Sequence, residues 1–123
     1  MANELTLSGS VVYEDSLNQA DSLGISDFIA SSDGQLIAHL SQLIGTDPKE
    51  IELGGVEDIG YAIFVNRDPT NTIHMQVGDG GAKFARLLPA KGFCILYMGD
   101  DAQVPFAYST TAPSKQEYFL VST

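Results

Sequence analysis

The single cysteine is the only thiol in this chain of 123 residues, so no internal disulfide can form. Cys94 lies in the apolar run of residues 93–98. A catalytic thiol needs a base beside it, whereas a lone cysteine in an apolar run usually packs as a small hydrophobic side chain. We therefore predict a structural role for Cys94.

Two histidines, His39 and His74, are the next candidates for chemistry. They could meet across strands as metal ligands, as in a cupin-like enzyme. Such a site usually adds a third and a fourth ligand at recognisable spacing, for example His-x-His, and the sequence has no such pair. His74 alternates with apolar neighbours, which favours a solvated histidine. We assign no catalytic, cofactor-binding or metal-ligating residue, and we expect no cofactor.

Three aspartates, Asp79, Asp100 and Asp101, lie beside glycines in turn-like segments. Oxygen ligands on such loops can bind Ca²⁺, but the D-x-D-x-D-G pattern is absent and aspartate is common in turns for backbone reasons. The run Gly-Asp-Gly-Gly at 78–81 lacks the Lys-Ser/Thr of a phosphate loop, and no Gly-x-Ser-x-Gly motif occurs. The sequence therefore predicts a protein that is not an enzyme.

The spacing of the apolar segments around these residues is typical of an all-β domain. Twelve glycines and five prolines divide the chain into short apolar pieces. Residues 5–13 alternate with a period of two, which indicates an antiparallel strand, and Gly9 suggests a bulge. Residues 14–21 form a polar loop in this interpretation. Further strands are expected at 83–88, 93–98, 104–108 and 117–121, and the strand at 93–98 is apolar on both faces.

The central part of the chain predicts a hairpin. Residues 59–65 are apolar on both faces, which predicts a central strand covered on each side. Residues 72–77 alternate cleanly, and the turn at 66–71 separates the two runs. Asn66 and Asp68 can accept backbone N–H groups there, so we expect this turn to set the register of the hairpin. In the alternative, Arg67 and Asp68 contact a neighbouring subunit.

Charge excludes several classes of protein. Six basic residues against sixteen acidic ones give a formal net charge of −10. Such a chain has no basic footprint for nucleic acid or for anionic lipid. Apolar runs are too short to span a bilayer, and the first residues do not have the pattern of a signal peptide. We expect neither a nucleic-acid nor a membrane partner, and the acidic surface favours solubility.

From about residue 37 onward, short features follow one another in a definite order. The order is a Gly-aromatic-apolar strand, an Asn-x-Asp turn, a strand, a phenylalanine-containing strand and a Leu-Pro-x-x-Gly turn. The pieces concerned are residues 43–46, 51–54, 59–68, 70–71, 84–92 and 117–121. This order resembles that of small virion proteins of tailed bacteriophages. These proteins are β-sandwiches that decorate the capsid or form other minor parts of the particle. The resemblance also bears on residues 35–44, whose apolar spacing is helical: it implies a strand, which we predict.

We accordingly expect an all-β fold: a single antiparallel β-sandwich, jelly-roll-like, over residues 1–123. The resemblance implies a capsid decoration protein that binds the outside of the shell and stabilises it. Its partners would be the major capsid protein and copies of itself in a homo-oligomer on the particle. It would reside in the virion after synthesis in the host cytoplasm. Residues 1–4 and the loop at 14–21 are candidate contact arms.

Three alternatives stay open at this point. The chain could be a tail or neck component of the same particle. It could be a carbohydrate-binding β-sandwich module, for which tyrosines supply stacking surfaces, although the chain has no tryptophan. The tyrosines are Tyr13, Tyr61, Tyr97, Tyr108 and Tyr118. A cupin-like enzyme is disfavoured by the histidine count.

Overall fold

A computed structural model describes residues 3–14, 17, 20–32, 37–90, 92–99 and 104–122. Within these ranges the regular structure consists of ten β-strands and no helix, which confirms the all-β prediction. The described residues therefore contain no helix that could span a membrane. The strands are β1 (Asn3–Glu14), β2 (Ala20–Ser32), β3 (Ile37–Ile44), β4 (Lys49–Glu50), β5 (Ile59–Asn66), β6 (Ile73–Val77), β7 (Lys83–Leu87), β8 (Phe93–Tyr97), β9 (Pro105–Ser109) and β10 (Ser114–Ser122).

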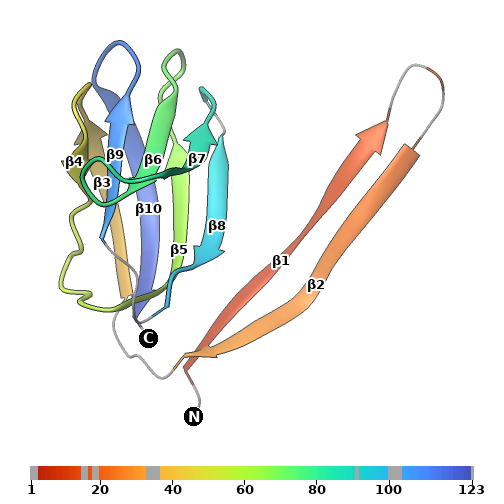
Figure 1. Ribbon diagram of the computed structural model, residues 1–123. Coiled ribbons are helices and arrows are strands. Elements are labelled where there is room, and N and C mark those ends of the chain that lie inside the picture. Colours follow the sequence, from red (N-terminus) through yellow and green to blue (C-terminus); the bar gives the residue numbers. More distant parts are fainter. Residues whose placement is uncertain are drawn as a thin grey trace. The chain divides into compact units, whose positions relative to one another are not determined.

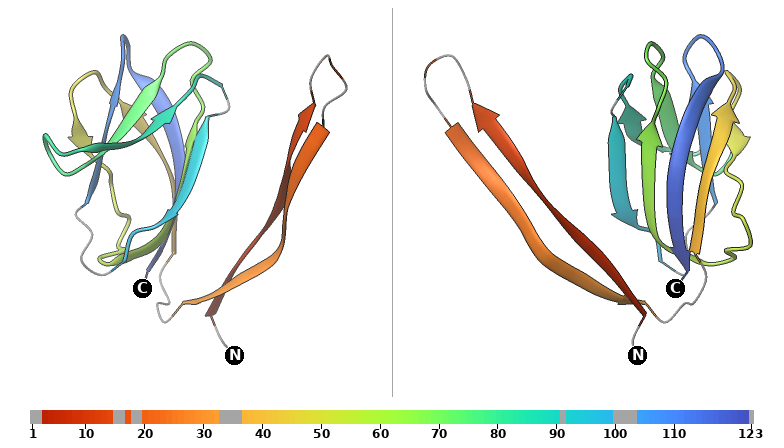
Figure 2. Two further views of the ribbon diagram at one scale, coloured as in Figure 1. Left: turned by 45° about the vertical axis from the view of Figure 1, so that its right-hand side comes forward. Right: turned by 180° about the vertical axis from the view of Figure 1, so that it is seen from behind.

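Eight of these strands form the β-sandwich, which consists of two antiparallel sheets (Figure 1). One sheet has the order β3-β10-β5-β8 and the other the order β4-β9-β6-β7. Figure 2, in its right-hand view, shows the first sheet from outside, with β10 and β5 in the middle. The pairs are nested, because β3 pairs with β10, β4 with β9, β5 with β8 and β6 with β7. A long hairpin rolled over itself gives this order, which is that of a jelly roll.

Strands β1 and β2 form a separate two-stranded antiparallel sheet. The chain divides into two compact units, Met1–Asp33 and Gly34–Thr123, and the eight sandwich strands all belong to the second. The predicted strand at 5–13 is confirmed as part of β1, and the register shifts between Leu7 and Gly9, where a bulge was expected. The predicted loop of 14–21 is wrong at its ends, since Glu14 belongs to β1 and Ala20 and Asp21 belong to β2.

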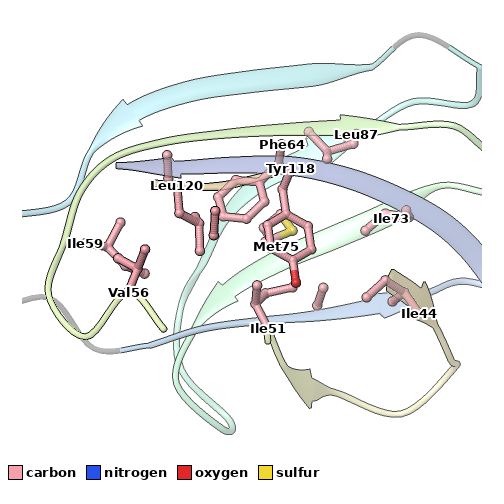
Figure 3. Close-up of a cluster of buried hydrophobic side chains, with 13 residues drawn as sticks. Ile44, Ile51, Val56, Ile59, Phe64, Ile73, Met75, Leu87, Tyr118 and Leu120 are labelled. Carbon is pink, nitrogen blue, oxygen red and sulfur yellow. The ribbon is translucent and has the colours of Figure 1, made fainter. Parts of the chain in front are cut away.

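The core of the sandwich lies between the inner faces of its two sheets. Figure 3 shows Phe64, Tyr118 and Leu120 of one sheet gathered against Ile73 and Met75 of the other. Phe64 and Tyr118 are at most 1% exposed, and their ring centroids lie 5.9 Å apart. Each such side chain contributes roughly 1.5–3 kcal/mol when it leaves water. This core makes the sandwich a firm support for whatever its outer faces bind.

Residues 37–44 form strand β3, so the strand predicted against the helical spacing is confirmed. Ala38 and Ile44 point inward and are buried, whereas Ile37 and Leu43 are 64% and 65% exposed. The apolar residues therefore lie on both sides of the strand. That distribution explains why the sequence lacks a clean alternation in this segment.

The predicted hairpin of residues 59–65 and 72–77 is wrong. Strand β5 pairs with β10 and β8, and β6 pairs with β7 and β9, so the two strands lie in different sheets. Residues 66–71 cross from one sheet to the other instead of turning within one. The central position of β5 in its sheet was predicted correctly.

The hairpin of this region is β6–β7, closed by the glycine-rich segment at 78–81. The Val77 N–H donates to the Ala82 carbonyl oxygen at 3.0 Å. A Cβ atom on Gly81 would lie 1.5 Å from the carbonyl oxygen of Val77, so the turn excludes every other residue there. This tight turn places β7 at the free edge of its sheet.

Candidate interaction surface

Cys94 lies on the inner side of β8, half-buried beside the core. Burial raises the pKa of its thiol to about 11. The thiol therefore stays protonated at neutral pH and acts as a packing group, because the thiolate is the reactive form.

The two histidines lie on opposite outer faces of the sandwich and do not meet. His39 alternates with the inward Ala38 on β3, and His74 alternates with the buried Ile73 and Met75 on β6. Among the described residues, no three His, Cys, Asp or Glu side chains gather as metal ligands would. Each histidine instead has neighbours of its own: His39 contacts Glu117 at 2.6 Å, and His74 stacks on Tyr108.

The loop aspartates and the tyrosines are dispersed. Asp79 is exposed in the β6–β7 turn, while Asp100 and Asp101 lie outside the described residues. Of the five tyrosines, the structure brings only Tyr61 and Tyr97 together among those whose side chains it describes, with ring centroids 5.0 Å apart. The side chain of Tyr13 lies outside the described part of the chain.

The crossing at 66–71 is held by the buried side chain of Asn66. Its Nδ2 donates to the carbonyl oxygens of Asn71 at 2.8 Å, Leu87 at 3.0 Å and Leu88 at 3.2 Å. Its Oδ1 accepts the N–H of Asp68 at 2.9 Å. Asn66 thus ties the crossing to the end of β7, and the expected acceptor roles of Asn66 and Asp68 are confirmed.

Asp68 completes this crossing. Its Oδ2 accepts the N–H groups of Thr70 at 2.9 Å and Asn71 at 2.6 Å. The N–H of Thr70, followed by that of Asn71, lowers the pKa of Asp68 below its ordinary value of 3.8. The neighbouring Arg67 binds Glu117 of the same chain, with Nε to Oε1 at 2.8 Å.

Asp68→Ala is expected to lower the melting temperature by roughly 4–8 °C at pH 7, because two turn N–H groups lose their acceptor. Asp68→Asn keeps an acceptor oxygen and serves as the control. Since the pKa is lowered in the folded state, the charged carboxylate stabilises the fold above the unfolded pKa, and this stabilisation is lost as pH falls through the folded pKa. Thermal melts from pH 2 to pH 7 should show a weaker acid dependence for Asp68→Asn. Equal acid dependence in the unaltered chain and in Asp68→Asn would contradict this role of the Asp68 carboxylate.

The outer side of the sheet β3-β10-β5-β8 is a surface that the core does not use. Strand register aligns its outward residues in rows that cross all four strands. One row runs from Ile37 on β3 to Tyr97 on β8, and the next runs from His39 to Ile95. We call this surface the apolar sheet face; its apolar members are Ile37, Leu43, Tyr61, Ile63, Val65, Phe93, Ile95, Tyr97, Phe119 and Val121.

The apolar sheet face is open along the edge strand β8, as it is at Ile37 and Leu43 on the opposite edge strand β3. Phe93 is 65% exposed, Tyr97 59% and Ile95 37%. Residues 93–98 were predicted to be apolar on both faces, as they are, but the strand stands at the edge of its sheet. Monomeric proteins rarely leave so many large apolar side chains together in water, so this surface is a candidate for contact with another protein.

Polar groups on the same face are paired with one another. Glu117 binds His39 at 2.6 Å and Arg67 at 2.7 Å. The hydrogen bonds from His39 and then from Arg67 lower the pKa of Glu117, so its carboxylate stays charged at neutral pH. His39 also meets the ring of Phe119 edge-on, with centroids 5.8 Å apart. The apolar sheet face thus has a paired polar group near one end.

No protein-family model, curated protein or solved structure matches this chain. The function must therefore be argued from the surfaces that the structure describes.

Sequence reasoning missed the apolar sheet face as a site. The signal was present in residues 59–65 and 93–98, where side chains on both faces of the expected strand are apolar. We interpreted that pattern as burial on two sides. An exposed interaction face leaves the same pattern, and only the sheet order separates the two explanations.

Proposed function

We propose that this chain is a capsid decoration protein of a tailed bacteriophage, which binds the outside of the shell and stabilises it. The observation that carries the proposal is the apolar sheet face. Its exposed aromatic and aliphatic side chains lie on a four-stranded sheet with a firm core behind it. A rigid apolar face loses little conformational entropy on binding, so more of the contact energy appears as affinity.

The size of this face fits a protein contact. Aromatic side chains bury about 150–250 Å² each when fully covered. Five side chains that are 37–65% exposed, namely Ile37, Leu43, Phe93, Ile95 and Tyr97, expose a surface on the order of 500 Å². Their half-buried neighbours extend it toward the roughly 800 Å² per partner of a standard interface. The major capsid protein is the proposed partner.

Two further features support a role on a repeating shell. The net charge of −10 would repel the chain from packaged nucleic acid. The β1–β2 sheet has two strands, and an isolated two-stranded sheet is marginally stable in water unless it packs on something. This sheet includes parts of the expected contact arms, namely residues 3–4, Glu14 and residues 20–21. The other residues of these arms, except Leu17, lie outside the described part of the chain: 1–2, 15, 16, 18 and 19. Many weak contacts repeated over a lattice add stability through avidity.

The test is binding to shells assembled without the chain. Phe93→Ser combined with Tyr97→Ser is expected to weaken binding at least about 100-fold, since two large apolar anchors are lost. Sedimentation of labelled protein with shells measures the affinity, and the melting temperature of the shell measures the stabilisation.

Leu88→Ser is the matched control, because Leu88 is 57% exposed but lies in a turn outside the sheet. We expect it to bind shells like the unaltered chain. Melting of each isolated variant shows whether the fold is intact. Binding by the double variant at unaltered affinity would refute the apolar sheet face as the contact.

A carbohydrate-binding module is the second candidate, favoured by the pair Tyr61 and Tyr97. Their rings are tilted by 59°, and Tyr97 is 59% exposed, so a sugar ring could stack there. Binding to a glycan array that Tyr97→Ser abolishes, without binding to shells, would favour this candidate. A map of the whole particle that places the chain at the tail or neck would favour the third candidate, a tail or neck component.

A further inference from the structure

The outer side of the other sheet carries a basic groove on β6 and β7. The groove has a volume of about 340 Å³ and is lined by His74, Lys83, Phe84, Ala85 and Arg86. His74 stacks on Tyr108 with centroids 4.8 Å apart and planes 15° apart. The Lys83 ammonium lies 5.4 Å from the centre of the same tyrosine ring. These contacts hold the basic side chains on a rigid aromatic base.

Positive charge accumulates in this basic groove, and no ion pair within the described residues offsets it. Burial lowers the pKa of His74, and the charges of Lys83 and Arg86 lower it further. The ion pairs found in the described part of the chain both involve Glu117, on the other sheet. Lys83 and Arg86 therefore have no carboxylate partner among the described residues, although the chain has a large excess of acids. Such a cluster suits an anionic partner.

The opposite edge of the same sheet carries an acidic strip. Edge strand β4 and the residues that flank it expose three carboxylates against a single lysine, Lys49. The carboxylates that form the acidic strip are Asp47, Glu50 and Glu52. None of the three takes part in an ion pair within the described residues.

The sheet order β4-β9-β6-β7 puts the acidic strip and the basic groove on opposite edges, three strand spacings apart, or roughly 14 Å. They cannot neutralise each other within one molecule. We propose that the basic groove of one copy binds the acidic strip of a second copy, in a head-to-tail contact. Repetition of such a contact produces a ring or an open chain of copies. The acidic carboxylates of the second copy are thus the anionic partner of Lys83 and Arg86.

This contact extends the proposed function, in which copies lie side by side on a shell, but it uses a different sheet from the apolar sheet face. The net charge of −10 opposes association, so a local match of opposite charges is what can bring copies together. The head-to-tail contact is tested on the isolated protein. Its test can therefore fail while the chain still binds shells, and shell binding can fail while the copies still associate.

The experiment is sedimentation velocity of the full chain at 10–500 µM, on the order of concentrations where weak self-association is populated. We expect the unaltered chain to associate as concentration rises. Lys83→Glu combined with Arg86→Glu should weaken association at least about 10-fold, because like charges then face each other. Glu50→Lys combined with Glu52→Lys should do the same.

The mixture of the two double variants decides the geometry. In the first double variant both the groove and the strip are negative, and in the second both are positive. A groove of one variant therefore meets a strip of opposite sign on the other. We expect association of the mixture to return to within about three-fold of the unaltered chain. Lys115→Glu, an exposed change on β10, controls for net charge and should have little effect. An unaltered chain that stays monomeric, or a mixture that associates no more than either variant alone, would overturn the proposal.

Discussion

Asn66→Asp is expected to lower the free energy of unfolding by about 3–5 kcal/mol at pH 7. The side chain of Asn66 is fully buried, and its Nδ2 faces the carbonyl oxygens of Asn71, Leu87 and Leu88. Aspartate replaces that donor with an oxygen, so the three carbonyls lose their partner and face an acceptor. Urea unfolding measures the change, and the midpoint should fall while the slope stays constant.

The pH dependence of this variant has a defined sign. An aspartate surrounded by carbonyl oxygens has a raised pKa in the folded state, because the charged form is disfavoured there. The loss of stability should therefore be small near pH 4 and grow as pH rises above the unfolded pKa of about 3.9. A loss that is the same at pH 4 and pH 7 would contradict the arrangement around Nδ2.

Asn71→Asp makes the same chemical change in the same crossing and serves as the control. The carbonyl of Asn71 that Asn66 uses is part of the backbone, and its Oδ1 accepts the hydroxyl of Thr111. Aspartate preserves both roles, although it removes the hydrogen bond that the Asn71 side chain gives the exposed carboxylate of Asp68. The expected loss is therefore well below that of Asn66→Asp, because the site is open to water, and an equal loss in the two variants would show that the network at Asn66 is not the cause.

The alternation of strands and turns could be predicted from the sequence, but their partners could not. Residues 66–71 are a turn as expected, yet the contacts that fix its direction run from Asn66 to Leu87 and Leu88, which are far along the chain. A local pattern carries no information about such distant carbonyls. The short distance between β5 and β6 in sequence therefore suggested a hairpin, where the structure has a crossing between sheets.

The candidate surfaces are hidden from the sequence for a related reason. Outward residues of β8 such as Phe93 and Tyr97 look like core residues, because periodicity does not separate burial in a fold from burial in a complex. The basic groove and the acidic strip are each ordinary in sequence. Their complementarity depends on β7 and β4 being the two edges of one sheet. Composition gave only the net charge, not its division between two edges.

Gln116→Met is expected to raise the free energy of unfolding by about 1–2 kcal/mol. Gln116 is fully buried on β10, and its Oε1 has no hydrogen-bond partner among the described residues. Its Nε2 donates only to the sulfur of Met75, at 2.9 Å, and sulfur is a weak acceptor. Methionine has a similar volume and no buried polar atoms to desolvate. Thermal and urea unfolding of the purified variant measure the gain.

Gln42→Met is the opposite case in the same row of the sheet, since Gln42 and Gln116 are paired in register. The Nε2 of Gln42 donates to the Glu50 carbonyl at 3.3 Å, and its Oε1 accepts the Glu52 N–H at 3.1 Å. Here methionine would leave a carbonyl and an N–H unsatisfied, so the same substitution should destabilise the fold by about 1–3 kcal/mol. Two glutamines of similar burial would then respond with opposite signs, as their hydrogen bonding requires. A loss of stability in both variants would show that Oε1 of Gln116 has a partner after all.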